Sequence, residues 1–366
     1  MTNLSDSERR AWLRLSRTQN VGPVTFAQLI ARFGSAGAAL KEVPRLAKRG
    51  GGETLRLPSE DDAAREIAAL AKLGGRVIAS CEAEYPRGLR AAEPAPPVIS
   101  VLGHVTLLDR EMVAMVGARN ASALGRKLAN TLARDLAESG LVVVSGLARG
   151  IDAAAHEGAL NGGTCAVVAG GVDVVYPPEN KALHESIARQ GCIVSEMPLG
   201  LQPQARHFPR RNRIISGLAR GVVVVEAAVG SGSLITANYA LEQGREIFAV
   251  PGSPLDPRAR GTNKLIRDGA TLTESAEDVL AGLRPILGQD FADPGRDAPS
   301  SPNEPSEAEA DRIRGLVIEA LGPAPVPVDE IVRLCQAPAG AVAIILLELE
   351  LAGRIARHPG GGVSWS

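Results

Sequence analysis

The segment FPRRNRIISG, residues 208–217, carries three arginines within four positions, next to an aromatic ring. The chain has no Asp or Glu between Met197 and Val225, but it has five arginines there: Arg206, Arg210, Arg211, Arg213 and Arg220. The segment has the pattern of a helix start, where the helix dipole favours negative charge and disfavours clustered cations. A solvated helix start is the simplest interpretation, but an anionic ligand explains the unbalanced charge better. Phe208 adds a flat apolar surface of the kind on which bases stack.

Small residues also gather where several predicted strands end. The strand that ends at Val116 is followed by Gly117, Ala118 and Arg119, and a helix begins near Ser122. Further candidates follow later strands: Ser145 and Gly146, then Gly170, then Gly232 and Ser233. Glycine lets a ligand approach the backbone closely, and free amides at a helix N-terminus bind anions. Several such turns at one edge of a sheet predict a phosphate-bearing ligand.

The familiar catalytic and nucleotide motifs are missing from the sequence. Residues 117–122 read GARNAS rather than G-x-G-x-x-G, and neither a phosphate-binding G-x-x-x-x-G-K-[ST] loop nor G-x-S-x-G occurs. His156 follows Asp152 by four positions on one helix face, which we interpret as a helix cap and an internal hydrogen bond. The four cysteines form no C-x-x-C pair and are predicted to be reduced core residues. We therefore expect no catalytic residue, no cofactor and no metal.

The order of predicted elements indicates a doubly wound α/β fold. Residues 1–75 have helical patterns, including a capping signal at Ser5 with Glu8 three positions later. Residues 76–284 alternate short apolar strands with helices, as in a parallel sheet covered on both faces. We predict an extended Rossmann-like core there, preceded by a small helical domain similar to sterile-alpha-motif or helix-hairpin-helix modules.

The C-terminal part of the chain reads as a separate module. Residues 285–307 are rich in Pro, Ser, Asp and Glu, which predicts a flexible linker. Residues 308–366 then show three helices, the second from Val328 and the third from Ala339, and a glycine-turned hairpin. This order predicts a winged-helix-like domain. Its third helix, AGAVAIILLELELAG, has no basic residue, so we expect protein contacts rather than DNA contacts from it.

Composition bounds the class of protein. The 366-residue chain has a net charge of −1, which argues against coating nucleic acid by bulk charge but allows a local basic patch. Apolar runs are too short or too often broken to span a bilayer, and the N-terminus has no apolar signal core. We expect a cytoplasmic protein without membrane contact. Only 3% of the residues are aromatic, which excludes a wide base-stacking surface. We expect a nucleic-acid site that stacks one or two bases and holds several phosphates.

From about Tyr85 to Ala270 the chain resembles the bacterial DNA-processing protein A family, also called Smf. The resemblance rests on the segments VAMVGARNAS, VVSGLARGIDAAAHEGAL, AGGVDVVYPPEN, SEMPLG, FPRRNRIISGL, VVVVEAAVGSGSLITANYALEQGREIFAVPGSP and GTNKLIRDGA. It implies a dimeric single-stranded DNA-binding protein that protects incoming strands during natural transformation (competence) and loads the RecA recombinase. The implied DNA pocket lies at Gly117, Ala118, Arg119, Ser145, Gly146, Gly170, Phe208, Arg211, Asn212 and Arg213.

The chain departs from the family pattern at one position. A lysine common in the family three residues before the Phe is Ala205 here, and Arg206 and Arg210 are the candidates to replace its charge. The resemblance also implies dimer contacts near residues 240–275. Two other functions stay open from the residues: a nucleotide phosphoribohydrolase-like enzyme with Glu226 as its carboxylate, and a transcriptional regulator acting through the C-terminal domain.

Overall fold

The computed structural model describes residues 3–53, 55–291 and 307–366. The chain divides into two compact units. One is built around Arg65–Pro294, and the other combines Leu4–Ala64 with Gly295–Ser366, so the N-terminal helices and the C-terminal module belong to the same unit. Helix α4 (Glu60–Lys72) runs across the division.

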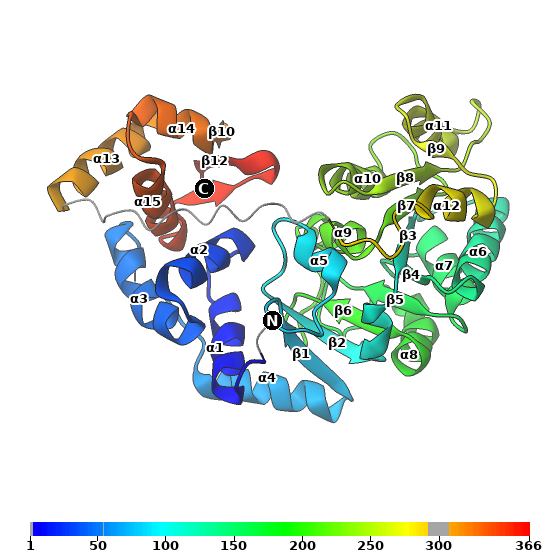
Figure 1. Cartoon of the computed structure of the whole chain (residues 1–366), viewed down its shortest axis with the longest axis horizontal. Helices are drawn as coiled ribbons and strands as arrows, with labels where there is room; N and C mark the ends of the chain where they lie inside the picture. The colour runs from blue at the N-terminus through cyan, green and yellow to red at the C-terminus, as the bar shows by residue number, and fades with distance from the viewer. Residues whose placement is uncertain (1–2, 54, 292–306) are drawn as a thin grey trace. The chain divides into compact units, whose positions relative to one another are not determined.

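Within residues 55–291 a nine-stranded sheet has the order β1-β2-β6-β5-β4-β3-β7-β8-β9 (Figure 1). Its strands are β1 Gly75–Ala79, β2 Val98–Gly103, β3 Met112–Val116, β4 Val142–Ser145, β5 Thr164–Val167, β6 Cys192–Ser195, β7 Gly221–Val224, β8 Glu246–Ala249 and β9 Thr271–Leu272. In the run β6-β5-β4-β3-β7-β8-β9, each strand pairs in parallel with its neighbours. Strand β2 pairs antiparallel with both β1 and β6. Because β3 leads to β4 on one side and β7 lies on the other, the strand order reverses between β3 and β7.

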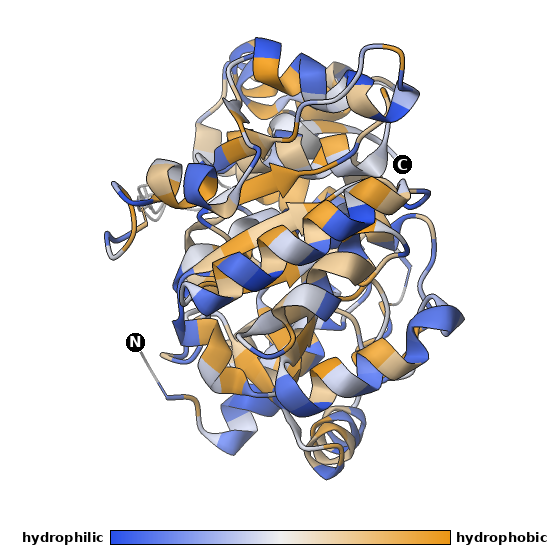
Figure 2. Ribbon diagram, turned by 90° about the vertical axis from the view of Figure 1, so that its right-hand side faces the viewer, coloured by the Kyte–Doolittle hydropathy of each residue, from blue (hydrophilic) through white to orange (hydrophobic). Residues whose placement is uncertain are grey.

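Helices cover both faces of this sheet. They are α5 Arg87–Ala91, α6 Ala123–Glu138, α7 Ile151–Ala159, α8 Lys181–Gln190, α9 His207–Leu218, α10 Gly232–Glu242, α11 Arg260–Arg267 and α12 Ala276–Leu283. Val113 and Met115 of β3 pack in the core beneath α6, α7 and α12, whereas Ala114 and Val116 pack in the core beneath α9 and α10. Hydrophobic residues concentrate on the strands in Figure 2. The two covered faces explain the unbroken apolar strands and confirm the predicted α/β class.

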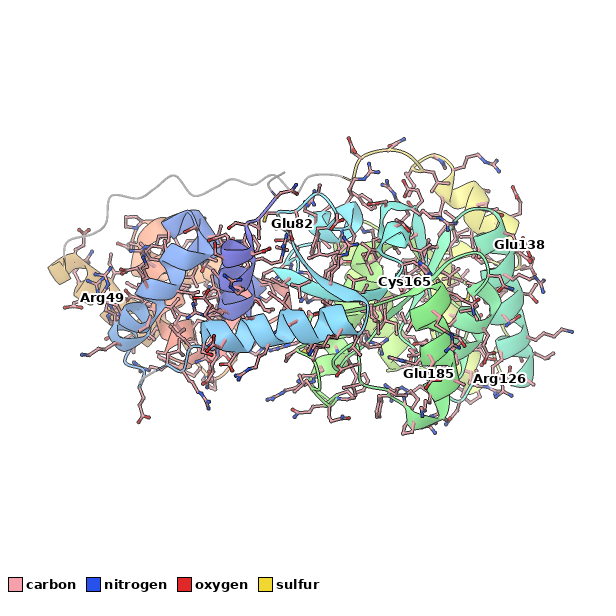
Figure 3. The ribbon with its side chains drawn as sticks, turned by 90° about the horizontal axis from the view of Figure 1, so that it is seen from below. Arg49, Glu82, Arg126, Glu138, Cys165 and Glu185 are labelled. Carbon is pink, nitrogen blue, oxygen red and sulfur yellow. The ribbon has the colours of Figure 1, made fainter. Side chains whose placement is uncertain are left out.

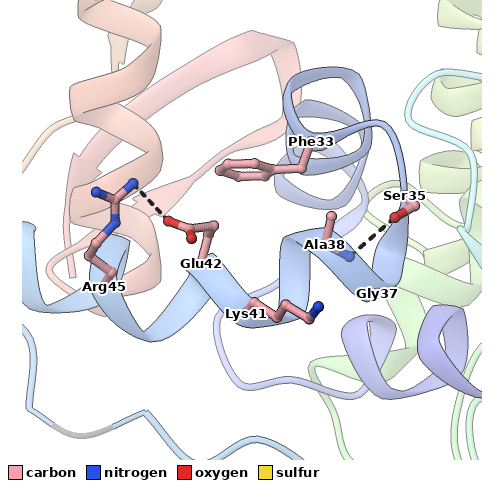
Figure 4. Close-up of a pocket in the computed structure, with 7 residues that line it drawn as sticks. All are labelled: Phe33, Ser35, Gly37, Ala38, Lys41, Glu42 and Arg45. Carbon is pink, nitrogen blue, oxygen red and sulfur yellow. Dashed lines mark hydrogen bonds and ion pairs between the residues drawn. The ribbon is translucent and has the colours of Figure 1, made fainter.

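The other unit contains two small helical arrays. The first consists of α1 Asp6–Ser16, α2 Pro23–Phe33 and α3 Ala36–Arg49. Ser5 caps α1 by accepting a hydrogen bond from the amide of Glu8 at 3.2 Å, as predicted. The Glu8 carboxylate instead accepts the Ala36 amide at 2.8 Å, so it fixes the start of α3. A shallow pocket between α2 and α3 contains the Glu42–Arg45 ion pair at 2.7 Å (Figure 4).

The C-terminal residues form the predicted winged helix. It contains α13 Glu307–Ala320, β10 Val326–Pro327, α14 Val328–Cys335, α15 Ala339–Leu351, β11 Ile355–Arg357 and β12 Gly362–Trp365. Strand β12 lies between β10 and β11 in an antiparallel sheet. The second and third helices begin at Val328 and Ala339, as expected.

Helix α15 packs on α3 as well as on its own domain. The Asn20 side-chain amide donates to the Leu351 carbonyl at 3.1 Å, and an added Cβ on Gly50 would lie 2.0 Å from the Glu348 carbonyl oxygen. Glu348 is only 2% exposed and pairs with Arg314 at 2.7 Å. One face of this apolar helix is therefore covered within the chain, by α3.

The predicted linker is wrong at its beginning. Ile286 and Leu287 pack on the core beneath α6 and α12, and the Phe291 ring lies 3.6 Å from the guanidinium carbon of Arg220. These apolar side chains gain burial there, which the polar composition of the whole segment concealed. The rest of the predicted linker, residues 292–306, lies outside the described residues.

In the described part of the chain, no single helix has the length and apolarity to cross a membrane. One sharply bent pair, Val328–Cys335 with Ala339–Leu351, meets that test by length and composition alone. The same part of the chain contains no cluster of three or more His, Cys, Asp or Glu residues that could hold a metal ion. Cys165, Cys192 and Cys335 are buried thiols.

Candidate nucleic-acid interface

Two closely packed turns place Arg119 at the carboxyl edge of the sheet. Gly117 directly follows β3, and an added Cβ there would lie 2.6 Å from the Ile151 side chain. Gly150 has φ +79°, and its Cβ would lie 2.3 Å from the Ala118 carbonyl oxygen. The Ile151 amide donates to that same carbonyl at 3.2 Å. Only glycine allows this approach at both positions, so the two turns fix the backbone that carries the exposed Arg119.

The start of α6 is already occupied by a carboxylate. Glu226, which follows β7, accepts the Ser122 amide at 2.9 Å and the Ser122 hydroxyl at 2.6 Å. The Ser122 hydroxyl in turn accepts the Gly125 amide at 2.8 Å. The expectation of free amides for a ligand at this helix start is therefore wrong for Ser122, because an internal anion compensates the helix dipole.

An aromatic and guanidinium cluster lies beside these turns. The Phe208 ring has the Arg119 guanidinium carbon 5.3 Å and the Arg211 guanidinium carbon 5.9 Å from its centre. The Tyr176 ring centre lies 5.7 Å from that of Phe208, with the rings inclined at 53°. Tyr176 is 44% exposed, and we did not predict it as a site residue. Its position after the Gly170 turn was the signal that could have indicated it.

Arg211 is the buried member of this cluster. It is 5% exposed and lies 3.9 Å from the Asp152 carboxylate, which also accepts the amides of Gly146 and Ala148 at 3.2 and 3.3 Å. An added Cβ on Gly146 would lie 1.2 Å from Nη1 of Arg211, so the guanidinium occupies the space above this glycine. Among the described residues, Nε of Arg211 has no hydrogen-bond partner. Burial lowers the pKa of Arg211, an effect that Asp152 opposes.

Burial also shifts the pKa values of two buried groups near the cluster, Asp152 and His156. Burial raises the pKa of Asp152, while Arg211 and two backbone amides oppose the rise. His156 is fully buried, and its Nδ1 lies 2.7 Å from the Thr164 hydroxyl, which confirms the predicted internal hydrogen bond. Burial, assisted by the charge of Arg211, lowers the pKa of His156 to about 3. His156 therefore stays neutral at ordinary pH and has a structural role.

The arginine block is less unbalanced than its sequence suggests. Arg213 pairs with Glu196 and donates to the Pro94 carbonyl at 2.7 Å. Arg220 pairs with Glu111 at 2.7 Å. Together with Arg211 and Asp152, three of the five arginines thus have acidic partners from outside the segment, so part of the charge of the block is compensated within the chain.

Two arginines at the start of α9 remain exposed. Within the described ranges, Arg206 and Arg210 have no ion pair. Burial and the charges of these two arginines lower the pKa of the nearby His207. Both arginines are free to contact an anion, as expected if they replace the charge missing at Ala205.

The remaining predicted residues make contacts within the chain at this edge of the sheet. The Ser145 hydroxyl is buried and donates to the Met115 carbonyl at 2.6 Å, so it links two strands and does not face a ligand. An added Cβ on Gly170 would lie 2.5 Å from the Leu201 carbonyl oxygen. Asn212 donates to the Gly232 carbonyl at 3.3 Å, and the hydroxyl groups of Ser233 and Ser231 are 2.9 Å apart. These contacts position the loops around the exposed cluster.

Fold and edge together define a class of protein. A Rossmann-like sheet whose carboxyl edge presents exposed arginines, two neighbouring aromatic rings and glycine turns is suited to phosphates and unpaired bases. The model of the DNA recombination-mediator protein A family matches residues 76–284. The chain belongs to this family, also known as DNA processing protein A or Smf. Its N-terminal helix-hairpin-helix model matches residues 6–69, and its winged-helix model matches residues 301–361.

Several relatives cover most of the chain. Protein Smf of Escherichia coli is 41% identical over 76% of this chain and 74% of its own length, and Protein Smf of Synechocystis is 32% identical over 98% of each. The solved structure of DNA processing protein A from Streptococcus pneumoniae matches 76% of this chain and 98% of its own, with TM-score 0.61 and 36% identity. That from Helicobacter pylori, described for its single-stranded DNA binding mode, covers 58% and 96%, with TM-score 0.53 and 29% identity.

Proposed function

We propose that this chain binds single-stranded DNA at the carboxyl edge of its sheet and acts as a recombination mediator. The observation that carries the proposal is the Phe208 ring, which lies against both Arg119 and Arg211. A base stacked beside this ring would leave its phosphate close to the exposed Arg119. A relative of known structure has a described single-stranded DNA binding mode, which supports the same ligand here.

Selectivity for the single strand follows from stacking. A base in a duplex must be unstacked and unpaired before its face can reach Phe208, which costs a few kcal/mol. We therefore propose weaker binding to a matched duplex.

Fluorescence anisotropy with labelled oligo-dT and a matched duplex, over a salt series, tests this function. Arg119→Ala should weaken binding to the oligonucleotide and reduce the magnitude of the log–log salt slope by about 0.7, because one phosphate contact is lost. Arg189→Ala, an exposed arginine at the end of α8, is the charge-matched control and should change neither. Equal affinity of the wild type for duplex and single strand would contradict the proposal.

In the cell we propose that this cytoplasmic protein protects incoming strands during natural transformation and loads the RecA recombinase onto them. Family membership supports this role. RecA filament formation on strands coated with single-strand-binding protein measures loading. No acceleration by the purified chain would contradict it.

We also propose a homodimer and no enzymatic activity. Leu241, Leu255 and Leu272, within residues 240–275, are 59%, 90% and 47% exposed, which supports an apolar contact between copies. Glu226, the carboxylate of the alternative phosphoribohydrolase function, holds the Ser122 amide and hydroxyl instead. Analytical ultracentrifugation tests the dimer, and a monomer would contradict it. Release of ribose 5-phosphate from nucleoside monophosphates would contradict the absence of activity.

A further inference from the structure

A groove of about 1000 Å³ begins at Arg119 and runs between α6 and α7. Its wall on α6 contains Arg126, Asn130 and Arg134, with Lys127 and Thr131 beside them, and Arg149 lies at its other edge. Arg119 belongs both to this groove and to the cluster around Phe208. A ligand that extends from the Phe208 cluster past Arg119 therefore enters the groove.

The spacing along α6 places its polar side chains in one row. Arg126, Asn130 and Arg134 are four residues apart, so they follow one another on the same face of the helix. With a rise of 1.5 Å per residue, the row from Arg126 to Arg134 is about 12 Å long. At a rise of about 3.4 Å per nucleotide, that length corresponds to roughly three nucleotides of a stacked strand. Figure 3 shows Arg126 and Glu138 at opposite ends of α6.

The groove has an excess of positive charge. Five basic side chains line it, whereas Glu157 is the acidic residue in its lining. Arg134 and Arg149 have exposed acidic partners at its rim, Asp135 at 3.1 Å and Glu179 at 3.3 Å. Within the described part of the chain, Arg126 and Lys127 are exposed and have no ion pair. Exposed pairs contribute little stability, so a phosphate can compete for Arg134 and Arg149 as well.

The arrangement argues against a simple solvated helix face. Arg126 and Lys127 lie close to the N-terminus of α6, where the helix dipole disfavours cations. Glu226 already occupies the end of that helix, so the anion-binding groups that remain are the side chains. Asn130 donates to the Ala154 carbonyl at 3.3 Å and links the two walls, so the basic residues face a preformed groove.

We propose that the α6–α7 groove holds the sugar-phosphate backbone of the nucleotides that flank those at Phe208, without reading their bases. This inference rests on the proposed single-strand binding and adds a direction: the strand leaves the Phe208 cluster past Arg119 and follows α6. No aromatic side chain lines the groove, so its contacts are made with phosphates. The groove therefore lengthens the binding site without adding sequence preference.

Oligo-dT of two lengths, roughly four and roughly sixteen nucleotides, separates the groove from the Phe208 cluster. The double variant Arg126→Gln/Lys127→Gln should bind the short oligonucleotide like the wild type, because the short ligand is held at Phe208. It should bind the long one more weakly, with a salt slope smaller in magnitude by about 1.4, because two phosphate contacts are lost. The charge-preserving variant Arg126→Lys/Lys127→Arg is the matched control and should retain the wild-type slope on both.

The groove proposal would be overturned if the glutamine double variant bound the long oligonucleotide with the affinity and salt slope of the wild type. This conclusion requires that Arg119→Ala still weakens binding to both lengths. Failure of the proposed function has a different signature, in which the wild type itself binds neither oligonucleotide. Both substituted side chains are exposed, so thermal unfolding should be unchanged and loss of binding cannot be attributed to misfolding.

Discussion

Phe208 is the residue on which the proposed function depends most directly. Two guanidinium groups and the Tyr176 ring surround it, and only one of those guanidinium groups is buried. Asp152 and Gly146 determine the position of that buried group, Arg211. The exposed partners, Arg119 and Tyr176, are left for the ligand.

Tyr176 should contribute to binding through its ring. Tyr176→Ala is expected to weaken binding of oligo-dT by about 1–3 kcal/mol, because a stacked base loses its aromatic partner. Tyr176→Phe, which retains the ring, should bind like the wild type. Anisotropy titrations of the two variants make the comparison. Equal weakening in both would mean that the hydroxyl group, and not stacking, is important.

His156 should make stability depend on pH. Its pKa of about 3 in the folded protein lies below its ordinary value of 6.5, so the unfolded chain takes up a proton first as the pH falls. The free energy of unfolding should therefore decrease from about pH 6.5 towards pH 3, by up to about 1.4 kcal/mol per pH unit from this group. Urea unfolding from pH 7 to 5 of the wild type and of His156→Gln provides the test. An unchanged pH slope in the variant would contradict the assignment.

At the scale of the elements, the sequence pattern was reliable where a periodic signal was strong. Apolar runs such as residues 142–145 became buried parallel strands, and the helices from Val328 and Ala339 formed the winged helix. The pattern failed where composition was averaged over a segment, as at Ile286 and Leu287. It also gave no sign that α15 is covered by α3, because an apolar helix shows burial but not the identity of its neighbour.

The contact between α15 and α3 should depend on Glu348. Its carboxylate is 2% exposed and pairs with Arg314 at 2.7 Å and Arg49 at 3.9 Å. Glu348→Gln should destabilise this unit by about 1.5–3 kcal/mol, because the buried carboxylate no longer accepts a charged hydrogen bond from Arg314. Asp311→Asn is the matched control, since Asp311 pairs with the same Arg314 but is 74% exposed, and it should change stability little. Equal unfolding midpoints for the two variants would contradict this role.

For the whole molecule, the proposed DNA contacts and the α3–α15 contact lie in different compact units. All predicted DNA contacts lie in the unit built around Arg65–Pro294. The third helix of the winged helix has no basic residue, which argues against a regulator that binds DNA through this domain.

Removal of residues 307–366 should therefore leave oligo-dT affinity within about twofold of the wild type, because no proposed phosphate contact is lost. The same truncation should increase amide hydrogen exchange in α3, whose contact with α15 would become exposed to water. Hydrogen-exchange mass spectrometry and anisotropy on one preparation measure both effects. Loss of all DNA binding would favour the regulator function, provided that α3 and the sheet unit remain folded.

By itself, the sequence determined the α/β class, the order of helices and strands, the glycine turns at the sheet edge and the family resemblance. Each depends on local periodicity or on short motifs, which the chain carries in adjacent residues. Only the tertiary structure decided which charges are free. Arg220 pairs with Glu111, 109 positions away, and Ser122 is bound by Glu226, 104 positions away. Charge compensation acts through space, so a block of arginines without nearby acids in the sequence does not establish how much of its charge is available to a ligand.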